Sequence, residues 1–133
     1  MEAVMEAAPV SSKMLWIGRI VSAVPVLILL ISALMKFAKP AGFAEGMEQL
    51  GWPENLATTL GVIEIICTIL YVIPRTAVIG AILLTGYLGG AIATHARIGD
   101  PAFVSAAVLG ILLWAGLHLR DARLRIMLAR SNS

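Results

Sequence analysis

The clearest structural signal in the chain is the sequence NLATTLGVIEIICTILYVIPRTAVIGAILLTGYLGGAIATHA, residues 55–96. It contains two apolar runs, residues 55–73 and 76–96, which are separated only by Pro74 and Arg75. A helix of about 20 apolar residues is long enough to cross a bilayer. Both runs are continuously apolar, whereas the strands of a membrane barrel alternate polar and apolar residues. Because so short a connection forces two helices to run antiparallel, this stretch predicts a membrane-spanning helical hairpin.

Two further apolar runs flank the hairpin, residues 14–35 before it and residues 101–119 after it. The first run is too long for the apolar part of a cleaved signal peptide. The chain of 133 residues is 59% hydrophobic and 14% charged, against about 25% charged residues in soluble domains. This composition excludes a disordered chain and argues against an ordinary soluble enzyme. We therefore predict an all-α integral membrane protein, a four-helix up-down-up-down bundle that forms a single membrane domain over residues 1–133.

The connections and the tail give the predicted orientation in the membrane. Phe43, Met47 and Leu50 are spaced as on one face of a helix, which predicts a short interfacial helix over residues 41–51. Positive charge favours the cytoplasmic side of a membrane. We therefore predict a multi-pass protein of the bacterial inner (plasma) membrane with both termini in the cytoplasm, a basic tail over residues 120–133 that lies on the lipid bilayer, and no nucleic-acid partner. One predicted end of the bundle holds seven of the ten Lys and Arg residues: Lys13, Arg19, Arg75, Arg120, Arg123, Arg125 and Arg130.

Polar residues at membrane depth mark the candidate site. A charge there costs at least about 2.5–3.5 kcal/mol. Glu64, in the middle of residues 55–73, is therefore expected to have a structural or functional role. Glu64 is nine residues from Asn55, and Tyr87 is nine residues from Ala96. At 1.5 Å per residue both lie about 13.5 Å below the same surface. A hydrogen bond between Tyr87 and Glu64 is therefore predicted to be within reach. Arg19 could extend to the membrane surface or toward Glu64, and both alternatives stay open.

Two sets of residues follow as candidates. Glu64 and His95 are the candidate catalytic acid–base residues, because a carboxyl and an imidazole can exchange protons. Cys67, the single cysteine, excludes an internal disulfide, and no metal site is predicted. Gly86 and Gly90 form a GxxxG pattern that suits close helix packing, either within the bundle or in a homo-oligomer. The candidate ligand-binding residues are Arg19, Lys36, Glu64, Tyr87, Thr94, His95 and Arg97.

Together these features resemble the DoxX-like family of small four-span bacterial membrane proteins. The residues that carry the resemblance, in chain order, are Arg19, Lys36, the Gly51-Trp52-Pro53 turn, Gly61 and Glu64, Pro74, the Ala91-x-x-Thr94-His95 pattern, and Arg97.

The resemblance implies a four-helix membrane bundle associated with membrane redox complexes. It implies an accessory subunit of an oxidoreductase system, with a quinone or another hydrophobic small molecule as ligand and redox proteins as partners. It also implies that Arg19, Lys36, Glu64 and His95 form the polar site. With one cysteine and no haem-ligand pair across the predicted core, electron transfer by this chain alone is not predicted. The alternatives are a small proton-coupled transporter, and a membrane isomerase or lipid-binding protein that uses Glu64 as an acid–base. Whether the protein is an enzyme stays open.

Overall fold

The computed structural model describes residues 11–132 and is helical outside its turns. Residues 1–10 and Ser133, which belong to the predicted domain and tail, lie outside the described residues. Five of the described helices begin and end within three residues of the four expected spans and the expected interfacial helix, and a further short helix lies within the basic tail. The described elements are α2 (Ser12–Ala38), α3 (Phe43–Leu50), the 3-10 turn η1 (Glu54–Leu56), α4 (Ala57–Val72), α5 (Ala77–Arg97), α6 (Ala102–Arg120) and α7 (Ala122–Ser131).

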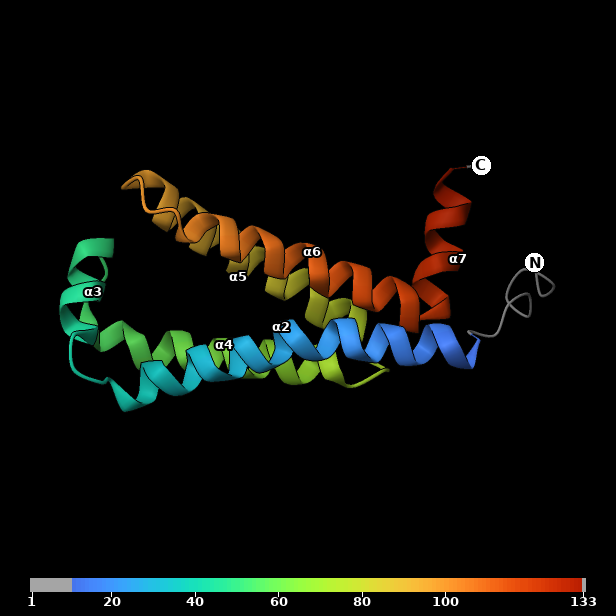
Figure 1. Cartoon of the computed structure of the whole chain (residues 1–133), viewed down its shortest axis with the longest axis horizontal. Helices are drawn as coiled ribbons and strands as arrows, with labels where there is room; N and C mark the ends of the chain where they lie inside the picture. The colour runs from blue at the N-terminus through green and yellow to red at the C-terminus, as the bar shows by residue number, and fades with distance from the viewer. Residues whose placement is uncertain (1–10, 133) are drawn as a thin grey trace.

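Four of these helices pack into a bundle. The helices α2, α5 and α6, and α4 together with η1, are each long and apolar enough to cross a membrane. Helix α2 packs against α4 and α6, and α5 packs against the same two helices. The order around the bundle is therefore α2–α4–α5–α6, with α2 and α5 facing each other across the interior (Figure 1). This arrangement is the predicted four-span bundle.

The outer surface of the bundle is apolar. Large side chains such as Ile20, Leu34 and Ile111 are 63%, 61% and 67% exposed. A soluble monomer rarely exposes so much contiguous apolar surface, whereas in a bilayer the lipid chains cover it. The surface therefore indicates that the four long helices span the bilayer.

Local backbone chemistry sets the ends of several helices. Helix α2 ends where Lys39 adopts a left-handed conformation, with φ of 47°, and Pro40 follows. Helix α3 lies between Gly42 and Gly51, whose φ angles of 86° and 80° favour glycine. Asp121 ends α6 in an extended conformation, and its side chain caps α7. As a result α7 turns away from the bundle (Figure 1).

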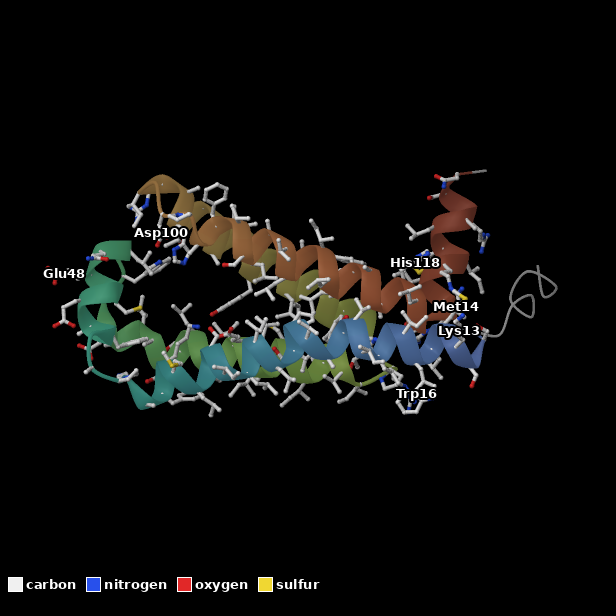
Figure 2. The ribbon with its side chains drawn as sticks, viewed as in Figure 1. Lys13, Met14, Trp16, Glu48, Asp100 and His118 are labelled. Atoms are coloured by element: carbon white, nitrogen blue, oxygen red, sulfur yellow. The ribbon has the colours of Figure 1, made fainter. Side chains whose placement is uncertain are left out.

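The bundle has two ends that differ in their connections. We call the "α7 end" the one that holds the start of α2, the α4–α5 turn and the α6–α7 junction, and the "α3 end" the opposite one. Figure 2 shows Lys13, Trp16 and His118 at the α7 end, and Glu48 and Asp100 at the α3 end. The pair α5–α6 diverges from the pair α2–α4 toward the α3 end (Figure 1).

Tyr71 is fully buried and joins three helices near the α7 end. Its hydroxyl donates to the backbone carbonyl of Leu113 on α6 at 2.6 Å and lies 3.0 Å from Ser22 Oγ on α2. Two glycines allow this close packing. A Cβ atom at Gly80 would lie 2.2 Å from the Tyr71 nitrogen, and one at Gly116 would lie 2.3 Å from Ser22 Oγ. Glycine is therefore required at both positions.

We expect Gly80→Ala to lower the free energy of unfolding by about 1–3 kcal/mol, because the added methyl group overpacks a helix contact. Gly86→Ala is the matched control on the same helix, since a Cβ atom there meets nothing within 4 Å. This control should unfold at the same temperature as the wild type or above it, because alanine favours helix over glycine. Thermal unfolding in detergent, followed by circular dichroism, measures both. Equal unfolding temperatures for the two variants would contradict the packing described.

Candidate functional site

Glu64 is buried at the centre of α4, with 1% of its surface exposed, and it faces the bundle interior. Lys36 Nζ forms an ion pair with Glu64 Oε2 at 2.8 Å. The Tyr87 hydroxyl donates to the same oxygen at 3.1 Å, and the Ser32 hydroxyl donates to it at 3.4 Å. Lys36 also donates to Ser32 Oγ at 2.7 Å. We call these four residues, Ser32, Lys36, Glu64 and Tyr87, the Glu64 cluster.

The Glu64 cluster crosses the interior of the bundle. Ser32 and Lys36 lie one turn apart on α2, Glu64 lies on α4, and Tyr87 lies on α5. Lys36 Nζ lies 5.9 Å from the centroid of the Tyr87 ring, so the ammonium group also contacts the ring face. A buried carboxylate is tolerated only when it is paired and hydrogen-bonded, and the cluster supplies both forms of compensation.

Gly61 explains how Lys36 reaches Glu64. A Cβ atom at Gly61 would lie 3.0 Å from the Phe37 ring and 3.3 Å from Lys36 Cβ. The absent side chain therefore lets the last turn of α2 approach α4 closely. The Gly-x-x-Glu spacing of the sequence thus places a site for close approach one turn before the carboxylate.

Four of the predicted site residues lie outside the Glu64 cluster, and two of them, Arg19 and His95, lie near opposite ends of the bundle. Arg19 is exposed, stacks 5.3 Å above the Trp16 ring and makes no contact with Glu64. His95 lies at the end of α5, with its Nδ1 3.0 Å from Asp100 Oδ2. The backbone N–H of Ala102 and the His95 ring hold the pKa of the Asp100 carboxyl below its ordinary value. His95 therefore contacts a loop carboxylate rather than Glu64.

Thr94 and Arg97 attach the α3 segment to the end of α5. The indole N–H of Trp52 donates to Thr94 Oγ1 at 3.4 Å, and Arg97 donates to the backbone carbonyl of Leu50. These contacts hold α3 and the turn after it against the α3 end of the bundle. Of the seven predicted ligand-binding residues, the structure brings together Lys36, Glu64 and Tyr87.

Several polar residues of the structure were not predicted from the sequence. Ser32 belongs to the Glu64 cluster, and its position four residues before Lys36 was the available signal. Tyr71 lies seven residues after Glu64, on nearly the same face of α4. Arg120 donates to the backbone carbonyl of Tyr71 at 2.6 Å and lies 4.5 Å from its ring.

Three features from the sequence analysis remain, namely the question of a metal site, Cys67 and the GxxxG pattern. Across residues 11–132, no group of three or more His, Cys, Asp or Glu side chains is arranged to hold a metal ion. Cys67 is a buried free thiol one turn from Glu64. Cβ atoms at Gly86 and Gly90 would meet nothing within 4 Å, so this GxxxG pattern is not used in packing within the chain. The homo-oligomer stays a prediction.

The comparisons with known proteins give one match. A family model described as the DoxX-like family matches residues 20–116, which contain every residue of the Glu64 cluster. No curated protein and no solved structure matches the chain significantly.

We expect Lys36→Met to destabilise the protein by about 3–5 kcal/mol, because it leaves the Glu64 carboxylate buried without its cation. The double variant Lys36→Met/Glu64→Gln should recover part of this loss, since neither charge then remains. Lys39→Met is the control, because Lys39 is exposed just beyond the same helix. Denaturant unfolding in mixed micelles compares the three variants. If Lys36→Met and Lys39→Met were equally stable, the ion pair would not contribute as described.

Proposed function

The chain belongs to the DoxX-like family, and we propose that it binds a hydrophobic ligand with a carbonyl or hydroxyl group, such as a quinone, beside the Glu64 cluster. In this proposal the protein is an accessory subunit of a membrane oxidoreductase system. The observation that carries the proposal is hydrogen-bonding capacity that the buried cluster leaves unused.

Lys36 supplies the donor for a ligand oxygen. An ammonium group has three N–H donors, and Lys36 uses two of them, one to Glu64 and one to Ser32. Its side chain is 17% exposed, whereas that of Glu64 is 1% exposed, so the ammonium lies at the edge of the cluster. The third N–H can therefore donate to a carbonyl oxygen. Such a charge-assisted hydrogen bond is stronger than one between neutral groups.

Glu64 supplies the complementary acceptor. Within the described residues, all hydrogen bonds to its carboxylate go to Oε2. Oε1 can therefore accept from a ligand hydroxyl. A quinone presents carbonyl oxygens and the corresponding quinol presents hydroxyl groups, so the donor on Lys36 and the acceptor on Glu64 suit both forms.

The proposal assigns electron delivery to a partner protein. A single cysteine cannot run a dithiol–disulfide cycle within one chain, so in this proposal the electrons for a bound quinone come from another protein. This supports a role as a ligand-binding subunit beside redox partner proteins.

The alternatives make different demands on Glu64. Proton-coupled transport and acid–base isomerisation both require its carboxylate to exchange protons during each cycle. The ion pair with Lys36 and the hydrogen bond from Tyr87 compensate the buried Glu64 carboxylate with fixed partners. This compensation favours ligand binding over the two alternatives.

We expect the soluble analogue decylubiquinone to raise the unfolding temperature of the wild-type protein in detergent, because a ligand that binds only the folded state stabilises it. Lys36→Met should weaken the apparent binding at least about tenfold, since a charge-assisted hydrogen bond contributes about 1.5–3 kcal/mol. Lys39→Met should keep wild-type binding. Equilibrium binding of the analogue at a temperature where all three proteins are folded separates affinity from stability. Saturable binding that is unchanged in Lys36→Met would place the ligand elsewhere, and no saturable binding would remove the proposal.

We also propose that the α7 end faces the cytoplasm. The described structure brings to this end the start of α2, the α4–α5 turn and α7, and with them the seven basic residues named in the sequence analysis. An excess of positive charge near the ends of the spans favours the cytoplasmic side.

A reporter fused to the C-terminus tests this orientation. Green fluorescent protein, which fluoresces when it folds in the cytoplasm, should be active, and alkaline phosphatase, which needs the periplasm, should be inactive. The reverse pattern would invert the proposed topology. Fusion of both reporters after Asp100, in the α5–α6 turn, is the matched control and should give the opposite result.

A further inference from the structure

A hollow of about 480 Å³ lies at the α7 end, among α2, the α4–α5 turn and the α6–α7 junction. Four arginines line it, namely Arg19, Arg75, Arg120 and Arg123, and Asp121 is the single acidic residue among them. Apolar side chains, including Leu117, complete the lining. This basic pocket is separate from the Glu64 cluster and shares no residue with it.

Asp121 does not neutralise the pocket. Its Oδ1 accepts the backbone N–H of Arg123 at 2.8 Å, and its Oδ2 pairs with the Arg123 guanidinium at 3.2 Å. Within residues 11–132, neither Arg19, Arg75 nor Arg120 has a carboxylate partner. The pocket therefore gathers three uncompensated positive charges, which repel one another unless an anion lies between them.

Arg120 is held in place with a buried donor unused. Its guanidinium donates to the backbone carbonyl of Tyr71 at 2.6 Å and stacks 4.5 Å from the Tyr71 ring. Its Nε is buried and has no hydrogen-bond partner in the described part of the chain. A buried charged donor without an acceptor is unfavourable, so Arg120 lines the pocket with its charge incompletely satisfied by the chain.

The level of the pocket suits a group at the membrane surface. Trp16, one turn from Arg19, is 60% exposed, and tryptophan favours the membrane–water interface. From the pocket toward the bilayer centre, α2 exposes the apolar side chains of Ile20 and Val24. A headgroup in the pocket would therefore have its acyl chains against an apolar helix face.

We propose that the basic pocket binds a phosphate ester, supplied by the headgroup of an anionic phospholipid. Phosphate oxygens match the planar guanidinium fork, and basic pockets between membrane helices are suited to anionic headgroups. The pocket gathers arginines from three segments around one hollow, which differs from a basic tail lying loosely on lipid. A soluble phosphate ester shares the same chemistry and is the other source that the experiment must separate.

Native mass spectrometry of the detergent-purified full chain tests the proposal, with phosphatidylglycerol, phosphatidylcholine and free glycerol phosphate as the three probes. Wild-type protein should retain phosphatidylglycerol saturably and phosphatidylcholine weakly. Each arginine near a membrane surface contributes about fivefold to such binding, so Arg19→Gln/Arg75→Gln should weaken it about thirtyfold. Both residues are exposed, and circular dichroism in lipid-free detergent checks that the double variant folds. Lys13→Gln is the matched control, because Lys13 is a basic residue of the same end that does not line the pocket.

Loss of phosphatidylglycerol in the double variant with retention in Lys13→Gln would support a lipid site. Tight binding of glycerol phosphate with the same dependence on the two arginines would support the phosphate chemistry and assign a soluble source. Weakening of about fivefold in Lys13→Gln, the same per charge removed as in the double variant, would show a non-specific charge effect and overturn the proposal. Unchanged lipid binding in the double variant would overturn it as well.

Discussion

A carboxylate buried at membrane depth is costly unless it is paired and hydrogen-bonded, and the ion pair between Glu64 and Lys36 supplies that compensation. Several features of the chain serve that pairing. Helix α2 must extend to Lys36 before it ends, and Lys39 and Pro40 stop it within one turn of that residue. Gly61 lets the two helices approach at the same level. The ion pair therefore requires α2 to extend at least to Lys36 and to lie close to α4 at the level of Glu64.

Tyr87 extends this constraint to the third helix. The hydrogen bond from Tyr87 on α5 to Glu64 on α4, together with the ion pair from Glu64 to Lys36 on α2, links α5 to α2 across the bundle. In lipid the helices gain little from apolar contact with one another, since lipid chains are as apolar as the side chains they cover. Polar contacts and close approaches at glycine therefore carry much of the specificity of the bundle. Tyr71 fills the corresponding role near the α7 end.

The sequence predicted the fold well because short local features, namely apolar runs and tight turns, determine how the long helices are arranged. Span length, short turns and the antiparallel hairpin placed Glu64 and Tyr87 at one level, and the structure joins them. Sequence reasoning could not tell whether Lys36 or Arg19 is the partner of Glu64. Which of the two cations reaches Glu64 depends on how α2 is rotated about its axis and where it lies along α4. The rotation and position of α2 depend on close contacts such as the one at Gly61. The spacing of apolar residues in the sequence does not reveal such contacts. The contact between His95 and Asp100 was missed for a related reason, since it runs across a turn rather than along a helix.

The two ends of the bundle differ in how their helices are held. At the α7 end, Gly80 and Gly116 allow backbone contacts that leave no room for a methyl group, and Tyr71 bonds to two neighbouring helices. Toward the α3 end the helix pairs diverge, and the connection is made by long polar side chains, by α3 and by its contacts to α5 (Figure 1). Long side chains adapt to small shifts of the helices, whereas glycine contacts do not. The tight packing near the α7 end therefore fixes the register of the four helices. The Glu64 cluster lies where the same helices are joined mainly by side chains. In this looser region the third N–H of Lys36 can remain without a hydrogen-bond partner in the chain.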